Sequence, residues 1–589
     1  AYDSLGQYER AIQSYQSALT TFQDIGDRTS EGITLANIAH LLKEQDQPEL
    51  AILFYKRSLN VRETIRGDIR GLSTDLQQSF TDTIADDYRA LADLLLQQNR
   101  IPEAQRVLDL LKVQELDDYL RDVQRSSNTE AGVAYQQPEQ RILDLYVEVI
   151  LAAEELAQLE NIPPPQLTPA QRTRLDQLQA QQDEISRSFS DFLALPKVVE
   201  ALDELKLDGQ PLHPETFTDL VDDLAELPTR SVLLYPLILE DRLELVLVSP
   251  DGTTARKPVP VSATDLTQAI ADYGQALKDY RSDPYPLAQQ LYSWLIAPLQ
   301  AELNAIGTEN IIYAPDGALR YIPLAALHDG ERWLAERYSF SHITAASLTD
   351  FTDAPTDELR LLAGACVDCS FSFDVLGRTF SFADLPFTEP EVSLLSTLID
   401  DNNVLLNQAM SPEEIKSQMG YYNILHLATH AAFVEGNPEE SFIVFGNNSR
   451  LSLADLNNWQ IPGTELVVLS ACETAVGSAQ LGDGREVLGL GYRMQTAGAK
   501  STLASLWAVS DGGTQVLMNA FYSALSQGLT KTEALKAAQL ALLNDDYSAV
   551  GGQRAELTVT SLDGEPLAPA DDLSHPYFWA PFILIGNGL

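Results

Sequence analysis

Two residues with reactive side chains, His430 and Cys472, each follow a short apolar segment, at 422–428 and 466–470. Both segments have the length and composition of buried β-strands. A cysteine thiol becomes a useful nucleophile when a nearby imidazole takes its proton. We therefore expect a thiol–imidazole pair held at the ends of two strands. On composition alone, a buried and inert Cys472 is the favoured alternative, because free cysteine is among the most buried residue types.

The sequence predicts no metal or cofactor site. His426 and His430 are four residues apart, but such a pair binds zinc on a helix and beside a Glu, whereas this segment is strand-like and lacks that Glu. Cys366 and Cys369 form a lone CxxC pair, which is weak evidence for zinc or redox function. With only three cysteines the chain has no disulfide framework, which fits a reducing compartment and leaves at least one thiol free.

The elements that must position the reactive pair belong to an α/β pattern that begins near residue 231. Apolar runs at 232–239 and 243–248 flank a polar turn and predict a β-hairpin. Farther along, strands are expected at 311–314 and 403–406 and a helix at 390–398. This alternation is typical of a largely parallel sheet, and ligands of such sheets gather beyond the carboxyl ends of the strands.

The first third of the chain predicts helical repeats instead. A small–aromatic–small pattern occurs at Ala11, Tyr15 and Ala18, returns at Ala51, Tyr55 and Ser58, and has a weaker copy around Ala104. Small residues let two helices approach, and the aromatic one turn later fills the groove between them. The pattern resembles tetratricopeptide (TPR) repeats over residues 1–112, although its spacing of 40 and then 53 residues is irregular. An unrelated array of helical hairpins is the alternative.

Between the two patterns, residues 113–225 are expected to form a helical linker region, broken by the three prolines at 163–165. A segment at 544–572 interrupts the later helix–strand rhythm and is expected to be a surface insertion. The chain starts without Met in what reads as the middle of a helix, so we expect it to be a fragment.

Four separated motifs in the second half resemble the CHAT family, caspase-like domains that commonly follow TPR repeats in bacterial proteins. They read His-Leu-Ala-Thr-His at 426–430, Leu-Ser-Ala-Cys-Glu-Thr at 469–474, Ala-Ser-Leu-Trp-Ala-Val-Ser-Asp at 504–511 and His-Pro-Tyr-Phe-Trp-Ala-Pro-Phe at 575–582. The resemblance covers residues 226–589 and implies a multidomain fold: all-α TPR-like repeats followed by an α/β caspase-like domain.

The resemblance implies a cysteine endopeptidase with a dyad of His430 and Cys472. The backbone N–H groups of Cys472 and Ala431 would bind the oxyanion, although caspases usually have Gly at the second position. The segment ending at Asp511 looks like one in separase, a related peptidase, which implies a pocket for Arg or Lys. Asp483, in a glycine-rich loop, is a second candidate acid for this pocket. A cap of the helix beginning near Gly513 explains Asp511 equally well, and turn chemistry alone would explain Asp483.

Composition limits the partners. The chain of 589 residues carries a net charge of −46, which repels phosphate backbones and anionic lipids. We expect no nucleic-acid or membrane binding, a cytoplasmic location, a protein or peptide substrate, and a regulatory protein bound by the repeats. The alternatives are a non-catalytic scaffold that binds proteins and a cysteine-dependent acyl transfer or amide hydrolysis on a small molecule.

Overall fold

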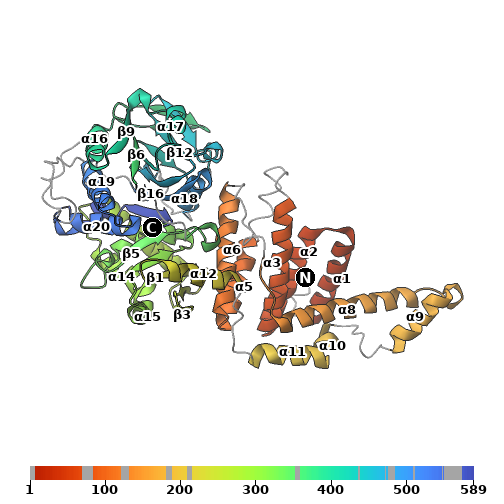
Figure 1. Ribbon diagram of the computed structural model, residues 1–589. Helices are drawn as coiled ribbons and strands as arrows, with labels where there is room; N and C mark the ends of the chain where they lie inside the picture. The colour runs from red at the N-terminus through yellow and green to blue at the C-terminus, as the bar shows by residue number, and fades with distance from the viewer. Residues whose placement is uncertain are drawn as a thin grey trace. The chain divides into compact units, whose positions relative to one another are not determined.

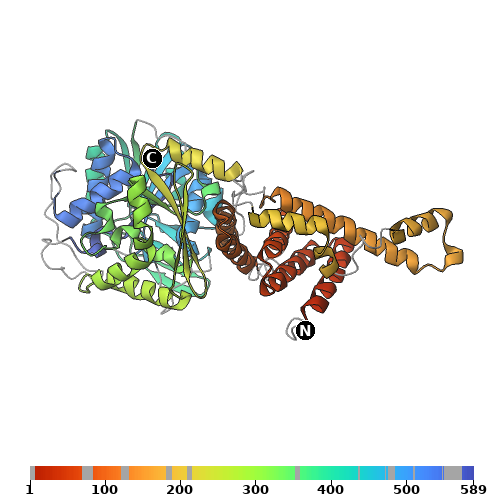
Figure 2. The ribbon, with the colours of Figure 1, turned by 90° about the horizontal axis from the view of Figure 1, so that it is seen from below.

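The computed structural model describes residues 7–68, 84–120, 132–180, 189–207, 215–351, 358–434, 438–470, 473–474, 484–507, 511–546, 548 and 573–589 (Figures 1 and 2). The chain forms two compact units, Ala1–Leu110 with Ser127–Glu215, and Leu111–Ser126 with Thr216–Leu589. Helix α6 (Ile101–Leu120) contributes its first half to the first unit and its second half to the second. The predicted boundaries at 112/113 and 225/226 stay predictions.

The first unit is helical throughout its described residues. Its helices are α1 (Tyr8–Ile25), α2 (Arg28–Glu44), α3 (Pro48–Asp68), α5 (Ile84–Gln97), the first half of α6, α8 (Gln137–Glu160), α9 (Pro169–Ala180), α10 (Phe189–Leu193) and α11 (Pro196–Leu207). Neighbouring helices α1, α2 and α3 pack in sequence order. Ala11, Ala51 and Ala104 of the repeat pattern are all buried. The helical repeats are confirmed, and the three prolines do interrupt the helices between α8 and α9.

A buried ionic cluster ties the helices of the first unit together. Lys56 of α3 is fully buried and contacts the carboxylates of Glu103 on α6 and Glu139 on α8, the latter at 2.8 Å. Arg100 lies 2.6 Å from Glu103 and 2.7 Å from Glu139. Each buried charge therefore has an opposite charge beside it, as burial of ionised groups requires.

The second unit contains a large sheet. Among the described residues its strand order is β3-β2-β1-β4-β5-β17-β16-β14-β10-β6-β9. The strands are β1 (Ser231–Ile238), β2 (Leu243–Val248), β3 (Thr254–Val259), β4 (Asn310–Tyr313), β5 (Ser339–His342), β6 (Arg360–Ala365), β9 (Asp401–Leu406), β10 (Ile424–Ala428), β14 (Thr464–Leu469), β16 (Ala499–Ser505) and β17 (Phe582–Gly586). The run from β16 to β9 is parallel throughout. The predicted hairpin is confirmed as β1 and β2, and the largely parallel sheet is confirmed as well.

Helices cover both faces of this sheet because alternate strand residues point to opposite sides. Leu466 and Val468 of β14 belong to a core shared with α13 (Ala263–Lys278), α14 (Tyr285–Leu295), α16 (Thr388–Leu398), α19 (Asp511–Ser526) and α20 (Lys531–Asn544). Val467 and Leu469 belong to a second core with α17 (Pro412–Gln418), α18 (Arg485–Ala497) and the second half of α6. The end of α6 is thus part of one helical layer of the second unit.

Smaller elements complete the second unit: the helices α12 (Glu215–Glu226), α15 (Gln300–Ile306) and α21 (Pro576–Trp579) and two small sheets. One sheet has the order β13-β12-β11-β15, with β11 (Ala431–Phe433), β12 (Phe442–Phe445), β13 (Ser449–Ser452) and β15 (Glu473–Thr474). The other pairs β7 (Ser372–Val375) with β8 (Arg378–Ser381). No helix within the described ranges has the length and apolar character needed to cross a membrane. Most of the predicted insertion at 544–572 lies outside the described residues.

Candidate active site

Residues before and after the two predicted dyad positions are paired with each other in the sheets. In the large sheet β10 pairs in parallel with β14, and Leu427 lies opposite Leu469. Just beyond, in the small sheet, β11 pairs in parallel with β15, and Ala432 lies opposite Glu473. Cys472 itself lies outside the described residues. Residues on both sides of His430 are therefore paired with residues on both sides of the Cys472 position.

His430 is 8% exposed, and a backbone carbonyl orients its imidazole. Its Nε2 lies 2.6 Å from the carbonyl oxygen of Ala383, and since a carbonyl only accepts, Nε2 must carry the proton and donate. The phenyl ring of Phe382 lies against the imidazole, with ring centroids 4.8 Å apart. In the neutral ring, Nδ1 is then the nitrogen with a free lone pair, the one able to accept a proton.

The surroundings favour the neutral form of His430. Burial lowers the pKa of this histidine, while the Ala383 carbonyl and the charge of Asp384 act in the opposite direction, and burial prevails. A histidine whose pKa lies below its usual value of about 6.5 is unprotonated at neutral pH. His430 is therefore in the state that a general base requires.

Strand β12 holds the backbone around His430 in place. The N–H of Val444 donates to the carbonyl of His430 at 2.8 Å, and the hydroxyl of Thr429 donates to the carbonyl of Val444 at 2.8 Å. Ala431, predicted to provide an oxyanion N–H, follows directly in β11 and is paired with Ile443. The histidine thus leaves the large sheet at the end of β10 and is fixed by the small one.

His426, on β10, has partners different from those of His430. It is fully buried, with Nδ1 3.0 Å from the hydroxyl of Tyr522 on α19 and Nε2 3.0 Å from Glu391 Oε1 on α16. The hydroxyl of Ser470, two residues before Cys472, donates to the same Glu391 oxygen at 2.6 Å. This buried network supports the strand that leads to Cys472, and sequence patterns did not reveal it because its members are far apart in the chain.

The predicted specificity residues are described only in part. Asp483 lies outside the described residues, and Asp511 is the first residue of α19, so that this helix begins slightly before the expected position near Gly513. Strand β16, which precedes α19, is parallel to β14, with Ala504 opposite Leu469. The start of α19 therefore follows a strand end at the same edge of the sheet as the dyad segments.

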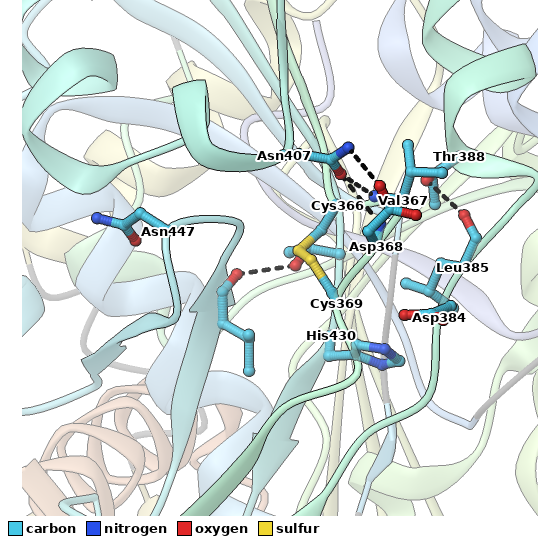
Figure 3. Close-up of a disulfide and its surroundings, with 12 residues drawn as sticks. Cys366, Val367, Asp368, Cys369, Asp384, Leu385, Thr388, Asn407, His430 and Asn447 are labelled. Carbon is cyan, nitrogen blue, oxygen red and sulfur yellow. Dashed lines mark hydrogen bonds between the residues drawn. A yellow bond between two sulfur atoms is a disulfide. The ribbon is translucent and has the colours of Figure 1, made fainter.

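From sequence alone, the CxxC pair is weak evidence for zinc or redox function. The structure joins Cys366 and Cys369 in a disulfide (Figure 3). The pair follows β6, the strand next to β10. No group of three or more His, Cys, Asp or Glu residues in the described part of the chain could hold a metal ion.

Comparison with known proteins identifies the domains. The model of the CHAT domain family matches residues 285–587, slightly more than half of the chain, and that of a tetratricopeptide repeat family matches residues 1–64. Human tetratricopeptide repeat protein 28 is 24% identical over 355 residues, and its mouse counterpart is 24% identical over 353 residues. Each alignment covers 51% of this chain and only 13% of the relative.

Two solved structures are similar at a low level. The separase–securin complex of Saccharomyces cerevisiae has a TM-score of 0.40 and 10% identity, covering 95% of this chain and 53% of that one. The Arg-specific cysteine proteinase gingipain R has a TM-score of 0.32 and 9% identity, covering 55% and 74%. Similarity at this level carries no argument about the function of this chain. The family match, together with the helical repeats and the large, mostly parallel sheet, shows that the chain belongs to the CHAT domain family and carries N-terminal TPR repeats.

Proposed function

We propose that this protein is a regulated cysteine endopeptidase that uses His430 and Cys472 as a dyad. The observation that carries the proposal is the double register: Leu427 opposite Leu469 before the two positions, and Ala432 opposite Glu473 after them. Neighbouring strands run about 4.8 Å apart. This spacing allows side chains at adjacent strand ends to approach within hydrogen-bond reach, about 3 Å, which proton exchange between a thiol and an imidazole requires.

The surroundings of His430 support the role of general base. With Nε2–H donated to Ala383, Nδ1 takes the proton of the Cys472 thiol, and the thiolate attacks the scissile carbonyl carbon. The backbone N–H groups of Ala431 and Cys472 stabilise the oxyanion that forms. The imidazolium then protonates the leaving amine, and a water molecule hydrolyses the thioester that remains.

The proposed specificity is for Arg or Lys before the cut, with Asp511 and Asp483 as candidate acids of the pocket. Support comes from the start of α19 at the same sheet edge as the dyad segments. A carboxylate in such a pocket is stabilised by an opposite charge on the substrate, which favours a basic side chain.

Regulation is proposed to act through helix α6, because its second half contacts the residues that follow β11 and also helix α18. The hydroxyl of Tyr119 lies 3.2 Å from that of Ser441, which accepts from the N–H of Val434 at 2.8 Å at the end of β11. On α18, which follows Cys472 in the chain, Gly489 packs so closely that an added Cβ would lie 2.8 Å from the Tyr119 ring. A protein bound by the repeats would act on the first half of α6, and the second half would transmit the effect to the end of β11 and to α18.

The test of the dyad is cleavage of peptides ending in Arg or Lys, compared between the parent protein, Cys472→Ala and His430→Ala. We expect both variants to lose activity by at least about 100-fold, the usual contribution of a nucleophile–base pair. Cleavage that survives Cys472→Ala would overturn the dyad. If the parent cleaves no peptide or protein but binds partners, the scaffold alternative holds. Turnover of small amides alone would favour the small-molecule alternative.

The role of α6 is tested by Tyr119→Phe, which removes only the hydroxyl that faces Ser441. We expect a changed kcat with little change in thermal stability. Tyr273→Phe is the matched control, because its buried hydroxyl donates to the Ala326 carbonyl in the core on the opposite face of the sheet. Equal kcat values for both variants would contradict the coupling.

A further inference from the structure

The Cys366–Cys369 turn lies beside the segment that orients His430. The two Cα atoms are 5.5 Å apart, within the ordinary range for a disulfide, and both cysteine side chains are fully buried. Asp368 and Ser370, in contrast, are exposed. The turn therefore runs along the surface with its sulfur atoms facing inward.

One side of the turn is fixed by Asn407 (Figure 3). Its Oδ1 accepts from the N–H groups of Val367 at 2.8 Å and Asp368 at 3.0 Å, and its Nδ2 donates to Asp368 Oδ2 at 3.1 Å. Because these bonds do not involve the sulfur atoms, they keep the two cysteines close when the disulfide is open. The pair is thus arranged to re-form its bond.

The other side of the turn holds the segment 382–385. Leu385 N–H donates to the Val367 carbonyl at 2.9 Å, Ser370 N–H to Asp384 Oδ1 at 2.9 Å, and Phe382 N–H to the Phe371 carbonyl at 2.8 Å. The carbonyl of Ala383, in the middle of this segment, accepts the Nε2–H of His430. Few hydrogen bonds separate the disulfide from the imidazole.

We propose that Cys366 and Cys369 form a thiol–disulfide exchange site that reacts with small disulfides and thiols, and that its oxidised form holds Ala383 in position to orient His430. The effect on catalysis rests on the peptidase function proposed above, but the exchange chemistry does not. The oxidised turn fixes the tautomer that leaves Nδ1 free. The reduced turn holds the segment 382–385 less firmly, and kcat falls.

A small disulfide of the glutathione class is the oxidant in the exchange. One cysteine thiolate attacks a sulfur of the small disulfide, forms a mixed disulfide and releases one thiolate. The second cysteine attacks the mixed disulfide, closes the Cys366–Cys369 bond and releases the other. Two cysteine thiols are oxidised, two small thiols are formed, and each takes up one proton. Because the sulfur atoms are buried, the reaction requires local opening of the turn.

The first test uses the full chain with Cys472→Ala, so that neither peptidase activity nor the third thiol contributes. The protein is equilibrated in buffers of graded oxidised-to-reduced glutathione ratio, then quenched and alkylated. Mass spectrometry of the peptide containing residues 366–369 distinguishes the oxidised pair, which has lost two hydrogen atoms, from the reduced pair, which carries alkyl groups. Hydrogen exchange of residues 382–385 is followed in parallel. We expect the pair to change state within this range, and exchange at 382–385 to be faster in the reduced form. A pair that keeps one state at all ratios, or equal exchange in both states, overturns the proposal.

Two variants sharpen this test. Asn407→Ala loosens the turn and is expected to react severalfold faster with reduced glutathione. Cys366→Ser/Cys369→Ser, with Cys472 intact, is the control for activity: its kcat should not fall at the most reducing ratios, whereas that of the parent should. A parallel fall in both proteins contradicts the link to His430. A pair that exchanges in a chain without any peptidase activity leaves the exchange site standing and refutes the proposed function instead.

Discussion

Replacing Lys112 with Met is expected to destabilise the second unit strongly, because it removes a fully buried charge partner. The ammonium of Lys112 lies 2.8 Å from Asp316 Oδ1, and neither side chain is exposed. Asp316 Oδ2 also accepts the N–H of Ile238 at 2.8 Å, which leaves the carboxylate fixed in place after the substitution. Breaking a buried ion pair from one side costs about 3–5 kcal/mol. Met matches the unbranched stem of Lys, so the loss reports the charge rather than the packing.

Differential scanning calorimetry of the full chain measures this effect. With two compact units we expect separable transitions, and a loss of this size lowers the midpoint for the second unit by roughly 5 °C or more. Lys112→Met/Asp316→Asn should recover most of the loss, since the neutral amide no longer needs a cation. Lys56→Met is the matched control, because that lysine is equally buried but belongs to the first unit. If Lys112→Met shifts the midpoint for the first unit, or neither midpoint, the assignment of the end of α6 to the second unit is refuted.

Three further predictions concern pH, the buried network and salt. Burial lowers the pKa of His342 to about 4. Below a pH of about 6.5, the histidine is therefore protonated in the unfolded chain but not in the folded one. The free energy of unfolding falls by up to about 3 kcal/mol as the pH drops from 6.5 to 4. Urea unfolding of His342→Phe should lack this loss; an unchanged slope with pH would contradict it. Glu391→Gln weakens the bond from the Ser470 hydroxyl and should lower kcat for Arg-ended peptides severalfold at constant KM, whereas an effect on KM alone would exclude a role in positioning Cys472. The net charge of −46 should make KM for basic peptides rise with salt; a salt-independent KM would assign the specificity to the pocket alone.

The strands that deliver the site could be predicted because their pattern is local. The apolar runs before His430 and Cys472 became β10 and β14, and parallel pairing placed their ends at the same edge of the sheet. The repeats were also recognisable, since buried small residues such as Ala51 recur at helix contacts. Local composition therefore indicated both the fold class and the edge where the reactive pair should lie.

The partners of His430 could not be predicted. Ala383 contributes a backbone carbonyl, which every residue carries, and its use depends on how the segment 382–385 folds back. Glu391 meets Ser470 across 79 residues of sequence, and no short motif encodes such a contact. The CxxC pair could be recognised in the sequence, but its proposed role depends on neighbours that only the folded chain brings together. Residues that orient reactive groups through tertiary contacts therefore cannot be predicted from local sequence patterns.

The dyad is tested most directly by covalent trapping. A peptide with a C-terminal Arg and a ketone warhead that alkylates thiols is added to the protein, and the site of attachment is located by mass spectrometry. We expect one adduct, on Cys472, that forms much more slowly in His430→Ala but at the normal rate in His342→Phe. Labelling of Cys472 at the same rate with and without His430, or no labelling of Cys472 in the parent, would contradict the dyad.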